Sequence, residues 1–179
     1  MTCLGKFSIF IDALNERVGR ATSYCTFFMV IITVIDVLLR YLFRAGSVGV
    51  QELEWHLFGF VFLLGAAYTL LKDEHVRVDI FYARRNKRGR AWVNLIGSII
   101  FCLPVSFVII WTSLPFVLSS WQFLEGSPDP GGLPARYILK SAIPVGFFLV
   151  ALQSISIAIK SLEVILTVEQ TDKTIASAD

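Results

Sequence analysis

The sequence has few charged residues for its length. Only 17% of the 179 residues are Asp, Glu, Lys or Arg, against about 25% in soluble domains. The formal net charge of +2 leaves no basic surface for nucleic acid, whose phosphate backbone is bound through many cations. An intrinsically disordered chain is excluded as well, because 55% of the residues are hydrophobic. A membrane protein remains.

Histidine and cysteine are also scarce, and their spacing suits neither a metal site nor a nucleophile. There are three cysteines and two histidines, with no Cys-x-x-Cys pair and no glycine-rich phosphate loop. His56 and His75 lie 19 residues apart, about 28 Å of helix, so they cannot share one haem iron. The sequence predicts no cofactor, metal or catalytic residue, and a bis-histidine haem would require a second chain.

Four long, mostly apolar stretches with few charges lie at residues 21–43, 53–71, 91–124 and 141–160. A membrane-spanning helix needs about 20 mostly apolar residues. Because the hydrocarbon core holds no water, every backbone N–H and C=O must find its partner within the helix. The sequence therefore predicts an all-α membrane protein with four transmembrane helices in a lipid bilayer.

The distribution of Lys and Arg predicts the orientation of these spans. Twelve of the 16 basic residues fall on one side of the membrane, and this side should be the cytoplasm. Both termini are therefore expected to be cytoplasmic. The four basic residues on the outer side are Arg40, Arg44, Arg136 and Lys140.

The third stretch is longer than one bilayer requires. Its 34 residues would form about 51 Å of helix, against about 30 Å of hydrocarbon. Trp92 and Trp111 fall where interfacial tryptophans are expected, so residues 114–124 should project past the outer face. Pro104 and Pro115 are predicted to bend this helix. An apolar helix end outside the lipid requires a partner to cover it.

The first and last segments are expected to lie outside the spans. In residues 4–18, apolar side chains recur at helical spacing with Lys6, Asp12 and Glu16 opposite them. We expect an amphipathic helix in the cytoplasmic interface, the alternative being a short solvated arm. Residues 167–179 are predicted to form a flexible tail.

Asp36 and Arg40 are the most unusual residues of the first span. Their i,i+4 spacing, with the acid first, favours an intrahelical ion pair. One hypothesis is a ligand for a coupling ion or substrate, because charges inside a membrane usually face protein or water. We favour a structural network, in which Arg40 or Arg44 joins Glu52 or Glu54 and fastens the first helical hairpin.

Small residues form a stripe along the fourth span, with Gln153 on its flank. Small side chains allow helices to approach closely, and a polar amide can bond across them. The stripe predicts a helix partner, either in this chain or in another one. Its members are Ala142, Gly146, Val150, Ser154 and Ala158.

The outer connection at residues 125–140 reads EGSPDPGGLPARYILK. Its prolines and glycines, with Asp129, Gly131 and Gly132 at its centre, predict a tight ordered turn. Arg136 and Lys140 then share one face of the next helix. This loop is either a docking rim for an extracytoplasmic protein or a plain chain reversal.

Several short sequence motifs occur at and between the predicted spans. The most specific are His-Val-Arg-Val-Asp, from His75 to Asp79, and the Gly-Gly-Leu-Pro turn at 131–134. The remaining stretches are Arg40-Tyr41, Glu52, Gly65-Ala66, Lys140 and Ile143-Pro144-Val145-Gly146-Phe147. Together they resemble the small (DctQ-like) membrane subunit of tripartite ATP-independent periplasmic (TRAP) transporters.

The resemblance implies a single small-permease domain over residues 1–179, in the inner membrane of a bacterium. Such a subunit forms a tight heterodimer with a large membrane subunit, which carries the substrate and sodium sites and moves as an elevator. A periplasmic solute-binding protein meets the outer face transiently. The small subunit is a static scaffold for import of an organic acid and has no catalytic residues. His75 and Asp79 would seat the cytoplasmic loop at the interface, or form a plain amphipathic connector.

We therefore expect an accessory scaffold subunit of a secondary transporter. A rival hypothesis from another class is a membrane anchor for an electron-transfer complex, which would need haem. A third hypothesis is a self-sufficient small carrier. Carriers usually have repeated halves with interrupted spans, and this sequence has no such repeat and only Asp36 and Arg40 charged within a span.

Overall fold

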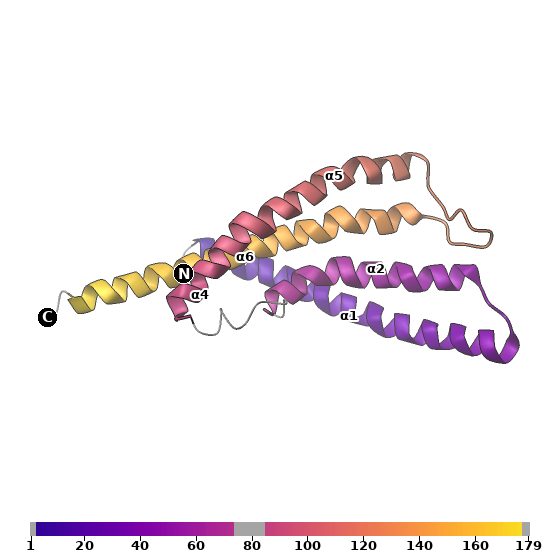
Figure 1. Ribbon diagram of the computed structural model, residues 1–179, viewed down its shortest axis with the longest axis horizontal. Helices are drawn as coiled ribbons and strands as arrows, with labels where there is room; N and C mark the ends of the chain where they lie inside the picture. The colour runs from indigo at the N-terminus through magenta and orange to yellow at the C-terminus, as the bar shows by residue number, and fades with distance from the viewer. Residues whose placement is uncertain (1–2, 74–84, 177–179) are drawn as a thin grey trace.

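The molecule is built from long helices. The computed structural model describes residues 3–73 and 85–176, and within them the chain is helical with short connections (Figure 1). In chain order the elements are α1 (Cys3–Phe43), α2 (Val48–Leu71), α4 (Lys87–Ile96), the π-helical turn η1 (Gly97–Cys102), α5 (Leu103–Gln122) and α6 (Arg136–Ala176).

Four helical passes are long and apolar enough to cross a membrane. They are Leu4–Phe43, Val48–Leu71, Lys87–Gln122 and Arg136–Val168. The predicted all-α fold and its four spans are confirmed. The second and fourth helices begin at Val48 and Arg136, a few residues before the predicted spans. The spans were predicted from apolar residues alone, so polar residues in the first turns of these helices were left out.

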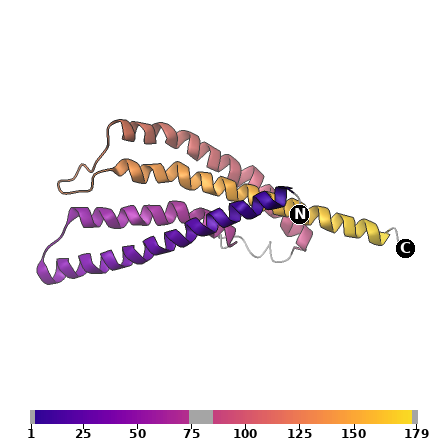
Figure 2. The same ribbon diagram turned by 180° about the vertical axis from the view of Figure 1, so that it is seen from behind.

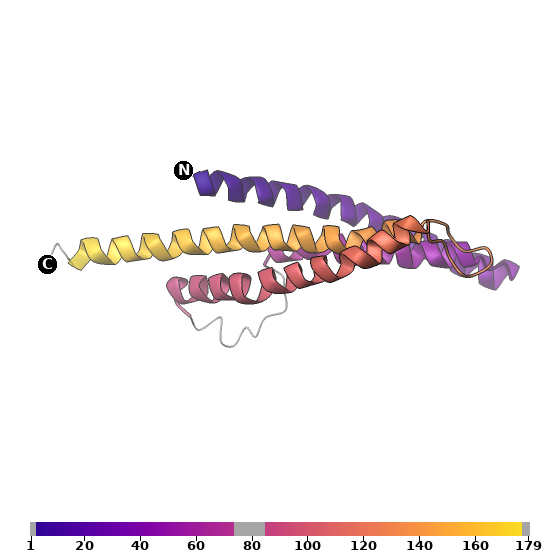
Figure 3. The same ribbon diagram turned by 90° about the horizontal axis from the view of Figure 1, so that it is seen from above.

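α6 is the central helix, and every other helix contacts it. Toward the end that carries the α1–α2 and α5–α6 connections, the helices lie side by side in the order α5, α6, α2, α1 (Figure 1). Seen edge-on, this part forms nearly one layer (Figure 3). At the opposite end, α1 and α4 lie on opposite sides of α6 (Figures 2 and 3). We call the first end the turn end and the second the terminal end.

The interior of this assembly is polar and its outside is apolar. Large hydrophobic side chains such as Phe28, Phe58 and Phe107 are more than half exposed. A protein in water would bury such residues, whereas lipid favours them on the surface and leaves polar groups to pair between helices. The largest fully buried side chains are Ile11, Gln153, Asn15, Ser8, Ser106, Ser154 and Ser156.

The predicted interfacial segment is continuous with the first span in one helix of 41 residues. No proline or turn separates them, and residues 8–15 pack against α6 rather than standing apart. The face that α1 buries there is Ser8, Ile11 and Asn15, whereas Phe7 and Phe10 are exposed. At the other terminus, α6 continues through residues 167–176, so this part of the predicted tail is helical.

The third pass is continuous through both of its prolines. Pro104 has no N–H and its ring crowds the preceding turn. The chain accommodates it by widening to η1 just before α5, where the Leu103 N–H donates to the Ser98 carbonyl, five residues back. Pro115 lies inside α5 without ending it. The bend expected at Pro104 therefore takes the form of a π-helical turn.

Candidate functional site

α2 and α6 approach each other closely at two glycines. Gly146 is buried, and a β-carbon there would lie 2.9 Å from the carbonyl carbon of Leu63 and nearer still to its oxygen. Gly59 faces α6 in turn, where a β-carbon would meet Leu139 at 2.8 Å. At Gly146 the partner of the small-residue stripe is thus a helix of the same chain.

A buried carboxylate organises the turn end. Glu52, on α2, is only 3% exposed. One carboxylate oxygen accepts hydrogen bonds from the Ser127 hydroxyl at 2.5 Å and the Arg136 guanidinium at 2.9 Å, and the other accepts from the Leu133 backbone N–H at 2.6 Å. We call Glu52, Ser127, Leu133 and Arg136 the turn-end cluster. It ties α2 to the loop between α5 and α6 and to the start of α6.

The loop sequence explains how its backbone reaches this carboxylate. Gly131 has φ +81, a conformation that side chains disfavour. A β-carbon on Gly132 would lie 2.8 Å from a Glu52 carboxylate oxygen. The exposed Asp129 caps the turn by donating its N–H to the Ser127 hydroxyl at 3.1 Å. The two glycines therefore let the loop wrap tightly around Glu52, and the predicted ordered turn is present.

A second ion pair closes the base of the same loop. Lys140 of α6 donates to Glu125, which also accepts from the Ser120 hydroxyl at 2.7 Å. Lys140 lies 4.0 Å from the centre of the Phe116 ring, on α5. The Lys140 hydrogen bond, followed by the Ser120 hydroxyl, holds the pKa of Glu125 below its ordinary value, although burial opposes this. Arg136 and Lys140 thus fasten α6 to both of its neighbours.

This loop pair makes stability depend on pH. Folding lowers the pKa of Glu125, so the ionised carboxylate stabilises the folded protein. This stabilisation is fully present above the ordinary carboxyl pKa of the unfolded chain, and it is lost as the pH falls through the lower pKa of the folded protein. We expect the protein to melt at a higher temperature than Glu125→Gln at neutral pH, with the difference closing in acid. A difference that stays constant down to acidic pH would contradict this assignment.

The structure corrects the predicted network of the first hairpin. Arg40 pairs with Asp36 on its own helix, as the spacing predicted. Glu52, however, pairs with Arg136 and not with Arg40 or Arg44, because it lies on the face of α2 that meets α6. Arg44 is exposed in the α1–α2 connection with φ 51, and Glu54 is half-buried. The prediction that Glu52 pairs with Arg40 or Arg44 and so joins α1 to α2 is therefore wrong.

Asp36 is 3% exposed, and Arg40 is its ion-pair partner. We expect Arg40→Ala to lower the yield of assembled protein several-fold, because a buried carboxylate is left without its cation. The affinity of the assembled complex for solute should not change. The double variant Asp36→Asn/Arg40→Gln, which removes both charges, should recover most of the yield. Normal yield with an altered solute Kd would refute the structural role.

A second polar cluster joins α1 to α6 at the terminal end. Gln153 accepts from the Asn15 amide at 2.7 Å and donates to Asp12 at 3.1 Å. Asp12 also accepts from the Ser156 hydroxyl at 2.7 Å and pairs with Lys160. The terminal-end cluster consists of Ser8, Asp12, Asn15, Gln153, Ser156 and Lys160.

Of this cluster, only Gln153 was predicted as a site residue. Asp12 looked like a solvated residue opposite an apolar stripe. The missed signal is the spacing of Ser8, Asp12 and Asn15, which places three polar side chains on one face of a helix. That face is the one that packs on α6.

The remaining predicted site residues form no ligand site in the described ranges. His56 is 8% exposed, and its Nδ1 lies 2.6 Å from the Glu52 carbonyl oxygen of its own helix. Between residues 3–73 and 85–176, no three His, Cys, Asp or Glu residues are grouped as metal ligands. His75 and Asp79 lie outside the described residues. The polar contacts join α2, α5 and α6 at the turn end and α1 and α6 at the terminal end.

Comparison with protein families supplies the identity of the chain. Residues 29–164 match the family model described as tripartite ATP-independent periplasmic transporters, DctQ component. A comparison with individual curated proteins found no match. The matched region begins in α1, ends in α6 and includes the turn-end cluster. The predicted resemblance is confirmed: this chain belongs to the DctQ family of TRAP transporter components, with four helices suited to crossing a membrane.

Proposed function

We propose that this chain is a static scaffold subunit that braces the substrate-carrying subunit of a TRAP transporter importing an organic acid. The observation that carries the proposal is how the chain uses its ionic groups. The buried carboxylates Asp36 and Glu52 are each paired with an arginine of the same chain. The Glu52 pair holds α2 to α6, and the Asp36 pair lies within α1. Both carboxylates are thus engaged by a fixed cation, whereas a transport site must bind and release its cargo.

The shape of the molecule supports the same role. Toward the turn end the helices lie in nearly one layer (Figure 3). Many large apolar side chains are exposed on the outside of these helices. Along the far part of α5, Leu114, Phe116 and Leu118 remain at least 43% exposed. A large membrane subunit that packs against this layer would cover such surfaces, forming the tight heterodimer.

The orientation belongs to the proposal as well. Basic residues are concentrated at the terminal end, so this end lies in the cytoplasm and the turn end faces the periplasm of a bacterial inner membrane. The loop around Glu52 then meets the periplasmic solute-binding protein. The rigid hydrogen bonding of this loop supports a docking rim better than a plain chain reversal.

Reconstitution tests the scaffold role directly. The large subunit and the binding protein are placed in liposomes with and without this chain, and solute uptake is measured. We expect uptake to be lost or strongly reduced without the chain, and this chain alone to carry no solute. Full uptake in its absence, or flux through it alone, would contradict the proposal.

The haem-anchor hypothesis makes a different prediction for the same material. Nδ1 of His56 lies at hydrogen-bond distance from a carbonyl of its own helix, so only the buried Nε2 of this ring is left for an iron. The purified complex should show no haem absorption in the visible spectrum. A haem spectrum that follows this chain through purification would replace the scaffold proposal.

A further inference from the structure

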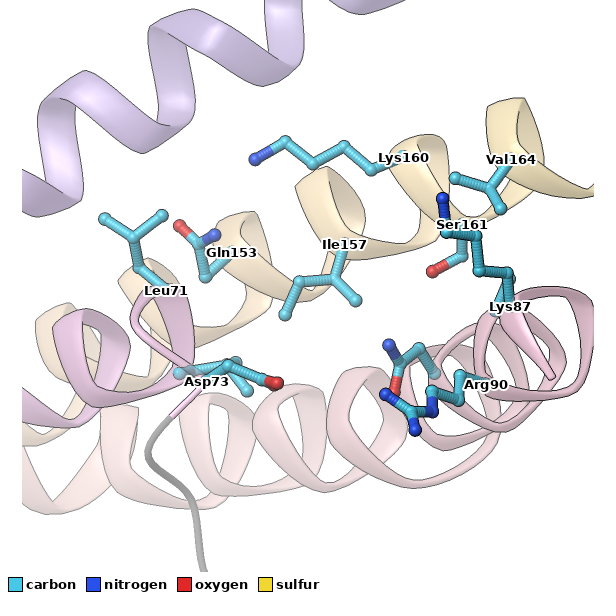
Figure 4. A pocket seen from close by; sticks show the side chains of 12 residues that line it. Leu71, Asp73, Lys87, Arg90, Gln153, Ile157, Lys160, Ser161 and Val164 are labelled. Atoms are coloured by element: carbon cyan, nitrogen blue, oxygen red, sulfur yellow. The ribbon is translucent and has the colours of Figure 1, made fainter. Parts of the chain in front are cut away.

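A groove of about 470 Å³ opens at the terminal end between α2, α4 and α6 (Figure 4). It lies beside the terminal-end cluster, since Gln153 and Lys160 line both. The groove opens to the surface, and neither the turn-end contacts nor the helix–helix packing uses it.

Basic side chains gather at the rim of this groove. Lys87 and Arg90, both exposed residues of the first turn of α4, line the groove, and Lys87 points toward α6 (Figure 4). The Arg90 Nε donates to the Arg85 carbonyl oxygen at 3.1 Å. Lys160 lies on the α6 side and points toward α1, where it pairs with Asp12. Among the described residues that line the groove, Asp73 is the one carboxylate. The rim therefore has an excess of positive charge and suits an anion.

The floor of the groove is apolar. Leu71, Ala91, Ile157 and Val164 line it below the rim, and Ala91 is only 6% exposed. A free anion gains nothing from such a floor, whereas an acyl chain is stabilised by it. Basic pockets between transmembrane helices on the cytoplasmic side are suited to anionic phospholipid headgroups.

We infer that this groove binds an anionic phospholipid, with its phosphate between Lys87 and Arg90 and an acyl chain against Ile157. The assignment to the cytoplasmic leaflet rests on the proposed orientation, but the binding itself does not. The lipid fills the space between α2 and α4, each of which contacts α6.

Native mass spectrometry of the full chain in detergent tests this inference. Phosphatidylglycerol is titrated in, with zwitterionic phosphatidylcholine for comparison. We expect Lys87→Gln/Arg90→Gln to bind phosphatidylglycerol about tenfold more weakly or worse, from the loss of two charges. The matched control Arg17→Gln/Arg20→Gln, with two exposed arginines removed from α1 at the same end, should change binding by about twofold at most. Ile157→Trp, which fills the floor without changing charge, should also weaken binding.

Three results would overturn the inference. The first is that Lys87→Gln/Arg90→Gln binds phosphatidylglycerol as tightly as the unmodified chain. The second is that the control variant Arg17→Gln/Arg20→Gln loses as much binding as Lys87→Gln/Arg90→Gln, which would indicate unspecific electrostatic attraction. The third is displacement of the lipid by an equal concentration of inorganic phosphate, which would indicate a site for a soluble anion. This experiment measures lipid binding and not transport. A negative result would therefore not contradict the scaffold proposal, which the reconstitution experiment tests separately.

Discussion

Replacing Gly146 with leucine is expected to separate α2 from α6 and to lower the yield of folded protein several-fold. Even a β-carbon at this position would overlap the backbone of Leu63, and backbone cannot move aside as a flexible side chain can. Overpacking of this kind costs about 1–3 kcal/mol or more, enough to change the amount of folded protein several-fold. The yield is measured by size-exclusion chromatography of the detergent extract, together with the melting temperature.

Gly97, in the third pass, provides a control. It is also a helical glycine, but a β-carbon there meets nothing within 4 Å. Gly97→Leu should therefore fold and purify close to the normal level. Equal yields for Gly146→Leu and the unmodified chain would show that the stripe does not hold these helices together.

Replacing Glu52 with alanine should release the loop between α5 and α6. The Ser127 hydroxyl, the Leu133 N–H and the Arg136 guanidinium would all lose their shared acceptor. Unpartnered buried donors are costly, and a buried cation without its anion is more so. We expect faster hydrogen exchange throughout residues 123–135 and a several-fold lower yield of complex.

The control for this variant is Glu54→Ala, which removes a carboxylate two residues away on α2. Glu54 is half-buried. Within the described residues, the ion pair with Arg136 is made by Glu52 and not by Glu54. Exchange in residues 123–135 should stay normal in this variant. If Glu52→Ala leaves exchange unchanged as well, the turn-end cluster does not order the loop.

The spans and the Asp36–Arg40 pair could be predicted because each is a local property of the sequence. A bilayer requires long apolar helices whatever their neighbours, and an i,i+4 pair needs only its own helix. The contact between Glu52 and Arg136 links residues 84 positions apart. It depends on which face of α2 meets α6, and charge spacing along the chain does not determine this.

The terminal-end cluster shows a different limit. Asp12 was assigned to a solvated polar face because the apolar residues around it recur at helical spacing on the opposite face, a pattern typical of an amphipathic surface helix. In a membrane protein the polar face is often the one that packs on another helix. Reading Ser8, Asp12 and Asn15 as an interface would have predicted their contact with α6.

The most direct test of the scaffold role is a structure of the assembled transporter with its solute and driving ion bound, in both inward-facing and outward-facing states. We expect solute and ion to lie in the large subunit, and the four helices of this chain to superpose between the two states. Solute or a cation held chiefly by Asp36 and its surroundings, or α2 and α6 moving apart between the states, would contradict the account.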